Sequence, residues 1–239
     1  GADGLRHGIM SIAPKGQDIR FSEERIEQGR NFCNKLWNVS RFRLMAAPLE
    51  DNSMVELIVL RIQGDLVSED DQAIILRLVE TLDQVEKLYV EYEFNAVLQT
   101  IYRFFWNDFC DWYIEASKAR VQEPASKDTC LAIQDICLRH ILLLLHPVTP
   151  FLTEELWFLL GVANGNSIQG VAPGTGAELL EKLSIGGLQL DTNVLNEMEN
   201  VRELVTSMRS LKADRNLSNN REIAFCYVAN VEKADILDR

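Results

Sequence analysis

The sequence contains none of the short motifs by which enzymes commonly hold phosphates, metals or acyl groups. It has no G-x-x-x-x-G-K-[ST] loop, no G-x-G-x-x-G fingerprint, no H-E-x-x-H pair and no G-x-S-x-G elbow. Residues 161–176 are glycine-rich, but they lack the lysine and the preceding strand that a phosphate cradle needs. We therefore expect no catalytic residues in the chain and interpret this stretch as an exposed connection.

Metal ligands, disulfides and membrane segments are equally scarce. The three histidines stand at no metal-ligand spacing from one another or from a cysteine, so no metal site is expected. The five cysteines include no C-x-x-C pair, which favours reduced thiols in a cytoplasmic protein. The longest apolar run, residues 141–145, is far shorter than the roughly 18 residues of a membrane span. No basic region followed by an apolar stretch marks the N-terminus, so neither a signal peptide nor a membrane partner is expected.

The charge is acidic overall but unevenly distributed. A formal net charge of −12 argues against a nucleic-acid partner, because phosphate contacts require Lys and Arg. Residues 1–45, however, carry eight Lys and Arg against five Asp and Glu, whereas residues 50–93 carry three against twelve. A polyanion would therefore approach the N-terminal part of the chain and be repelled by the segment that follows.

Apolar residues recur at helical spacing along most of the chain. The pattern predicts helices over residues 3–12, 22–45, 68–88, 93–121, 126–146, 153–160 and 191–212. Ser22 and Ser68 are the expected N-caps of the second and third helices, and Ser68 forms a capping-box pattern with Asp71. Residues 54–62 fit either a strand or a short helix, and residues 222–229 resemble a strand.

The expected fold class is all-α, an antiparallel helix bundle with a small C-terminal α/β appendage. Residues 1–21 are interpreted as a connection, residues 22–215 as the bundle, and residues 216–239 as the start of an appendage or linker. The inner side of the second helix is expected to include Phe32, Leu36 and Val39, with Trp37 beside them. In the helix over 93–121, the expected inward residues are Phe94, Val97, Leu98, Ile101, Phe105, Phe109 and Trp112.

An aromatic and acidic stretch, residues 106–115, has the most unusual composition in the chain. Asp108, Asp111 and Glu115 stand at i, i+3 and i+7, which in an α-helix places three carboxylates along one face. Such a stripe could bind a divalent cation, but it has no histidine partner. We expect the acids to pair with basic side chains of neighbouring helices, where they could also orient a Lys or Arg that meets phosphate.

The second helix presents a second unusual face. Amide, cationic and aromatic side chains recur there at i, i+3, i+4, i+7, i+10 and i+11, in Asn31, Asn34, Lys35, Asn38, Arg41 and Phe42. Unpaired RNA bases are recognised by such groups, because amides read base edges, cations meet phosphates and rings stack on bases. An ordinary polar outer face is the alternative, although three asparagines within eight residues are costly for helix propensity, which favours a functional role.

The same helix carries a family resemblance. Residues 30–42, with RNFCNKLWN and the following RF, resemble the anticodon-domain helix of valyl-tRNA synthetases. The stretch FCDWYIE over 109–115 resembles that family's F-C-D-W-Y-(I/L)-E signature, and HPVTPFLTEELW over 146–157 is similar to a motif shared among class I synthetases for branched aliphatic amino acids. The likeness covers about residues 1–220 and departs from the family at Gly4, at Thr149 and over residues 47–67.

The resemblance implies a tRNA anticodon-binding domain cut from a larger ligase. H-I-G-H, K-M-S-K-S, the editing domain and the coiled-coil arm are all absent, so the chain alone should be inactive and hold no cofactor. The parent would use ATP and Mg, and its catalytic domain would contact the N-terminal segment. The implied partner is the anticodon loop and stem of valine tRNA, not DNA. The implied contact residues are Arg30, Asn31, Asn34, Lys35, Asn38, Arg41, Phe42, Arg209 and Lys212.

Two other interpretations stay open on the sequence alone. A helical protein-interaction scaffold that binds no RNA is favoured by the net charge of −12. The same kind of domain from an isoleucyl- or leucyl-tRNA synthetase would share the more general class I motif.

Overall fold

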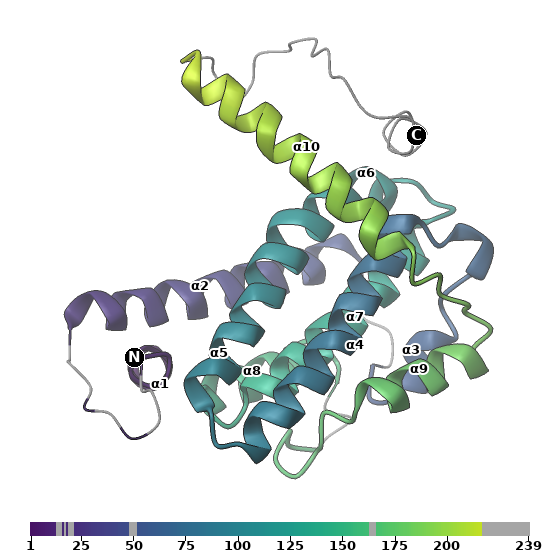
Figure 1. Ribbon diagram of the computed structural model, residues 1–239. Coiled ribbons are helices and arrows are strands. Elements are labelled where there is room, and N and C mark those ends of the chain that lie inside the picture. The colour runs from purple at the N-terminus through teal and green to yellow at the C-terminus, as the bar shows by residue number, and fades with distance from the viewer. Residues whose placement is uncertain (13–15, 17, 19–21, 48–51, 163–165, 217–239) are drawn as a thin grey trace. The chain divides into compact units, whose positions relative to one another are not determined.

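The computed structural model describes residues 1–12, 16, 18, 22–47, 52–162 and 166–216. All regular elements in these ranges are helices, which confirms the expected all-α class (Figure 1). The chain divides into two compact units, residues 1–190 and residues 191–239, which are described separately. The predicted strand over 222–229, and with it the predicted α/β appendage, lies outside the described residues.

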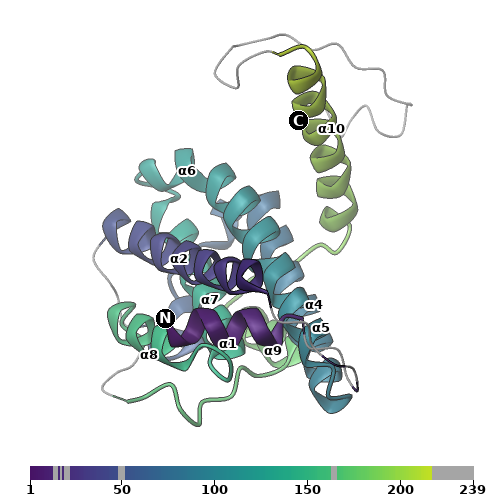
Figure 2. The same cartoon turned by 90° about the vertical axis from the view of Figure 1, so that its left-hand side faces the viewer.

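Two N-terminal helices, α1 (Ala2–Met10) and α2 (Glu23–Ala46), lie side by side (Figure 2). Their close approach depends on glycine. A Cβ added at Gly29 of α2 would collide with the backbone oxygen of Gly4, and one at Gly8 would lie 2.6 Å from the backbone oxygen of Arg25. Only residues without side chains allow two helix backbones to pack this closely.

Helix α1 is also bound to the start of α8 (Pro150–Leu159). Asp3 accepts a 2.6 Å hydrogen bond from the backbone N–H of Leu152, which is one of the N–H groups left unpaired in the first turn of α8. Arg6 donates to the backbone oxygens of Val148 at 2.8 Å and Pro147 at 3.1 Å. Two charged side chains of α1 thus fix it to a turn almost 150 residues away in the sequence.

The centre of the first unit is α7 (Lys127–Leu145), which packs against α4 (Glu69–Val90) and α6 (Ile114–Gln122). Every residue of α7 from Thr129 to Leu145 is buried. A helix that is buried on all sides must be covered on all sides, and α2, α3 (Val55–Val59), α5 (Phe94–Tyr102) and α8 also pack against it. Its few polar side chains find partners among these helices: Gln134, for example, donates to the hydroxyl of Ser117 at 3.2 Å.

The N-terminus of α4 confirms the predicted capping box. The Ser68 hydroxyl accepts from the backbone N–H of Asp71, and the Asp71 carboxylate accepts from that of Ser68. The same carboxylate accepts from the Tyr113 hydroxyl at 2.7 Å and pairs with Arg120 at 2.5 Å. The aromatic and acidic stretch is therefore fixed to the first turn of α4.

The helix predicted over residues 93–121 is continuous, but its middle is not an α-helix. It consists of α5 (Phe94–Tyr102), a π-helical segment η2 (Arg103–Tyr113) and α6. Wider π-helical turns, with i→i+5 hydrogen bonds, change which residues face inward. Phe94 is 38% exposed, so its predicted inward position is wrong, and Trp112 is only partly buried, whereas Phe104 and Tyr113 fill the core.

Other elements refine the remaining boundaries. The ambiguous segment 54–62 contains a short helix, α3 (Val55–Val59), followed by a 3-10 turn, η1 (Gly64–Leu66). Helix α8 begins at Pro150, not at the predicted Thr153, because proline suits a first helical position and Thr149 precedes it as N-cap. Sequence reasoning missed α9 (Gly176–Ile185), whose start is marked by a capping box of Thr175 and Glu178.

The second unit contains α10 (Val194–Asp214) within its described residues. Its N-cap is Asn193, so the helix starts later than the predicted residue 191. The Asp191 carboxylate instead accepts a 2.9 Å hydrogen bond from the backbone N–H of Asn193 in the turn before the helix. Across the described ranges of both units, no helix combines the length and apolar character needed to cross a membrane.

Replacement of Gly29 by alanine tests the close contact of α1 and α2. Helix propensity alone would make Gly29→Ala stabilising by about 1 kcal/mol. The collision with the Gly4 carbonyl should reverse the sign and lower the free energy of unfolding by about 1–3 kcal/mol. Urea denaturation measures the difference. Gly1→Ala is the control, since a Cβ there has no neighbour within 4 Å; a stabilised Gly29→Ala variant would contradict the close contact.

Candidate nucleic-acid interface

The face predicted on α2 exists and points outward. Phe32, Leu36 and Arg43 on the opposite side are almost completely buried, which fixes the orientation of the helix about its own axis. The predicted face is exposed except for Lys35, whose side chain is 33% exposed, and comprises Arg30, Asn31, Asn34, Lys35, Asn38, Arg41 and Phe42. Phe42 is 37% exposed and thus does not belong to the core.

Trp37 also belongs to the outer surface. Sequence spacing placed it beside the inner residues, but its side chain is 40% exposed, so that interpretation is wrong. Trp37 lies three residues from Asn34 and four from Arg41, and residues at these separations are neighbours on a helix surface. An exposed indole therefore borders the amide and cationic groups of the face.

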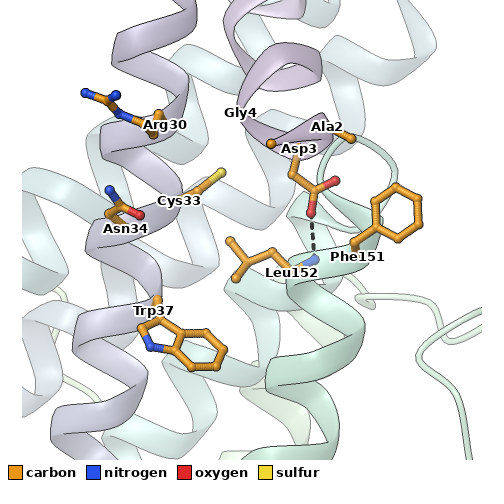
Figure 3. A pocket seen from close by; sticks show the side chains of 10 residues that line it. Ala2, Asp3, Gly4, Arg30, Cys33, Asn34, Trp37, Phe151 and Leu152 are labelled. Atoms are coloured by element: carbon orange, nitrogen blue, oxygen red, sulfur yellow. Dashed lines mark hydrogen bonds between the residues drawn. The ribbon is translucent and has the colours of Figure 1, made fainter.

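A cavity of about 620 Å³ adjoins this side of α2 (Figure 3). Trp37, Asn34, Cys33 and Arg30 line it from α2, and α1 and the start of α8 close the other side. Burial, reinforced by the charge of Asp3, raises the pKa of the Cys33 thiol to about 11, so the thiol is protonated at neutral pH and a poor nucleophile. The cavity can thus offer aromatic and amide contacts but no activated cysteine.

The opposite flank of the face meets η2. The Lys35 ammonium lies 3.2 Å from a carboxylate oxygen of Asp111 and 5.0 Å from the ring centroid of Trp106. Trp106 in turn stacks on Tyr102, with centroids 5.3 Å apart and an interplanar angle of 14°. Sequence reasoning missed Tyr102 and Trp106 as members of this surface, because spacing within one helix does not show which side chains of another helix they contact.

The three carboxylates of the stretch have different environments. Asp111 pairs with a basic residue of a neighbouring helix, which confirms the expectation for that residue. Glu115 pairs with Lys118 of its own helix at 2.7 Å, and Asp108 is only 9% exposed. Because the helix is π-helical from 103 to 113, the predicted single stripe of three acids on one face is wrong.

Rings continue inward from this flank. The ring centroids of Tyr102 and Phe32 are 5.9 Å apart. Phe32 in turn stacks on His7 of α1, with centroids 4.2 Å apart and an interplanar angle of 18°. A column of rings therefore runs from α1 through α2 to Trp106 and the Lys35 ammonium. His7 is buried and neither ring nitrogen has a partner among the described residues; burial lowers the pKa of His7 to about 4.

The remaining predicted contact residues, Arg209 and Lys212, lie three residues apart on α10. Arg209 is exposed and Lys212 is partly buried. They belong to the second unit, whereas the face on α2 belongs to the first. No group of three or more His, Cys, Asp or Glu side chains that could hold a metal ion occurs within the described ranges.

Comparison with known proteins identifies the domain. Residues 71–227 match the family model described as the anticodon-binding domain of tRNA ligase. The chain belongs to this family. The match includes Trp106 and Asp111 of η2 but begins after α2.

Curated relatives extend the similarity over α2. The chain is 33% identical to the valine–tRNA ligase of Syntrophotalea carbinolica over 237 residues, which cover 98% of the chain and 25% of that protein. It is 35% identical to the Bacillus subtilis valine–tRNA ligase over 228 residues, covering 93% of the chain and 24% of that protein. The Coxiella burnetii valine–tRNA ligase is 33% identical over 238 residues, again 98% of the chain. The chain spans about a quarter of the length of these relatives.

Burial of neutral His7 predicts a specific pH dependence. The unfolded chain protonates this histidine below about pH 6.5 and the folded chain only near pH 4, so stability should fall as the pH drops through this window. Between pH 7 and pH 5 the wild-type chain should lose about 2 kcal/mol more free energy of unfolding than His7→Phe, which keeps a ring against Phe32. Denaturant titrations at both pH values measure the difference. Equal losses in the two proteins would contradict a buried neutral imidazole.

Proposed function

We propose that the chain recognises the anticodon loop of valine tRNA as the anticodon-binding domain of a valine–tRNA ligase. The observation that supports this proposal most directly is the outer face of α2, where amides, cations and an exposed phenyl ring occur together on one helix. Unpaired RNA bases require this combination of groups. The family match and the similarity to valine–tRNA ligases over 98% of the chain support the proposal.

Each type of residue on the face has its own role in the proposed complex. Lys35, Arg30 and Arg41 meet phosphates, which position the loop without reading its sequence. Asn31, Asn34 and Asn38 pair with base edges, and the ring of Phe42 stacks on a base. Arg209 and Lys212 of α10 supply further phosphate contacts to the same tRNA.

The activity of the whole ligase belongs to parts outside this chain. The parent would activate valine with ATP and Mg in the cytoplasm and transfer it to the tRNA, while this domain supplies recognition. The catalytic domain of the parent ligase would contact α1, which is already fixed to both α2 and α8. Recognition at α2 would then be passed to the catalytic part through a rigid connection.

Phe42→Ala separates recognition from folding. Loss of a stacked base should weaken the binding of valine tRNA by about 1–3 kcal/mol. The free energy of unfolding should fall by about 1–2 kcal/mol, less than the roughly 3–5 kcal/mol of a core phenylalanine, since the ring is 37% exposed. Filter binding and thermal melting on the same variant measure both quantities.

Phe158→Ala is the matched control for this experiment. It removes the same ring from a 50% exposed position on α8, outside the proposed face, and should leave tRNA affinity unchanged. Equal losses of affinity in the two variants, or an unfolded Phe42→Ala protein, would argue against the proposed face.

Asn38→Ala tests sequence reading. Removal of a base-edge contact should reduce discrimination between a valine anticodon and a substituted one, with less effect on affinity for the substituted tRNA. Competition binding with the two tRNAs measures the ratio. A uniform loss of affinity for both would place Asn38 on the RNA backbone instead.

The chain by itself should be inactive in valine-dependent pyrophosphate exchange. Neither nucleotide-binding motif of the class I ligases occurs in its sequence. Exchange above background by the purified chain would overturn the assignment to a recognition domain, provided that mutation of the chain abolishes it.

A further inference from the structure

The ammonium of Lys35 has a defined position on the proposed RNA face. It contacts Asp111 at 3.2 Å and lies over the Trp106 ring at 5.0 Å, so two residues of η2 determine where its charge lies. Trp106 is itself held by its stack on Tyr102. A flexible lysine side chain loses rotamer entropy when a ligand fixes it in one position. Lys35 is already ordered by Trp106 and Asp111 before a ligand binds, so less of this entropy is lost on binding.

The π-helical segment makes this arrangement possible. Trp106 and Asp111 are five residues apart, and in an α-helix residues five apart point about 140° away from each other. The i→i+5 hydrogen bonds of a π-helix bring residues at this separation onto adjacent turns. Both side chains can therefore meet the same ammonium from one helix.

The two contacts have opposite consequences for a phosphate. An indole ring orients a cation without neutralising it, whereas a carboxylate occupies the position that a phosphate oxygen would take. The side chain of Asp111 is 53% exposed, so this ion pair is weak and open to solvent. An incoming phosphate could displace the carboxylate while the ring keeps the ammonium in place.

We propose that Asp111 is an internal competitor for the RNA phosphate at Lys35, and that Trp106 is the positioning residue that keeps Lys35 ready to accept it. This inference rests on the proposed function and adds a regulation of the same site. Asp111 lowers the affinity of Lys35 for any phosphate, so it weakens the binding of every RNA that contacts Lys35 by the same factor. Asp111 thereby limits affinity at this contact and leaves sequence selectivity to the base contacts.

A double-mutant cycle with the full 239-residue chain and a valine tRNA transcript tests the proposal. Asp111→Asn should tighten binding at low salt by about two- to fivefold, the range expected for an exposed ion pair. In a Lys35→Ala background the same substitution should change affinity little, because the cation for which Asp111 competes is gone. The gain should be the same factor for a tRNA with a substituted anticodon, because a phosphate contact carries no sequence information.

Glu115→Gln is the matched control. It removes one charge from an exposed carboxylate four residues further along, whose partner is Lys118 and not Lys35. Any effect of Glu115→Gln should therefore persist unchanged in the Lys35→Ala background. Thermal melting of each variant confirms that all of them are folded.

Two results would overturn the competitor role. One is a gain from Asp111→Asn that persists undiminished without Lys35, which would mean that the carboxylate acts only through net charge. The other is unchanged or weaker binding by Asp111→Asn, which would make Asp111 a support for Lys35. Absence of salt-dependent tRNA binding by the wild-type chain would instead refute the proposed function itself.

Discussion

The outward face of α2 depends on an ion pair buried beneath it. Arg43 and Asp135 are 1% and 2% exposed, and the guanidinium donates to both carboxylate oxygens, through Nε at 2.7 Å and Nη2 at 2.8 Å. Arg61 adds a third hydrogen bond to the same carboxylate at 2.8 Å. A buried charge left without its partner is strongly destabilising. The pair therefore disfavours any rotation of α2 about its axis that would separate Arg43 from Asp135. Arg43 is nine residues, or two and a half turns, from Asn34, so the two lie on opposite sides of the helix. Burial of Arg43 therefore turns Asn34 toward solvent.

The other half of α2 is constrained by α1 rather than by charge. Gly4, Gly8 and Gly29 allow the two backbones to approach, and Asp3 and Arg6 bind α1 to the start of α8. Thr149, which is buried at this junction, stands at the N-cap position of α8 without a side-chain cap hydrogen bond; its hydroxyl donates to the backbone oxygen of Leu145 at 3.3 Å. These contacts make α1, α2 and α8 one group, so displacement of α2 by a ligand would be transmitted to α1.

Local signals in the sequence predicted much of this fold. The Ser68 capping box and the 3.6-residue spacing of α2 depend only on residues within a few turns of one another, and the structure agrees with both. The burial of Arg43 could not be predicted in this way, because its partner is 92 residues distant. The π-helical segment was not predicted, because the spacing argument assumed α-helical geometry and so put Asp108 and Asp111 on one face. In an α-helix Trp106 and Asp111 would point in different directions, so their shared contact with Lys35 could not be predicted either.

The overall charge of the chain bears on how such a face could select its RNA. With a net charge of −12, non-specific attraction to phosphates is limited to the N-terminal part of the chain, so discrimination by the proposed face would rest on short-range contacts to bases. Asparagines suit that task but disfavour the helix that presents them, by up to about 0.7 kcal/mol each. Helix α2 tolerates three of them because its opposite side is held by Phe32, Leu36 and the Arg43–Asp135 pair. The buried side of the helix thus stabilises a sequence that the proposed recognition face requires on its exposed side.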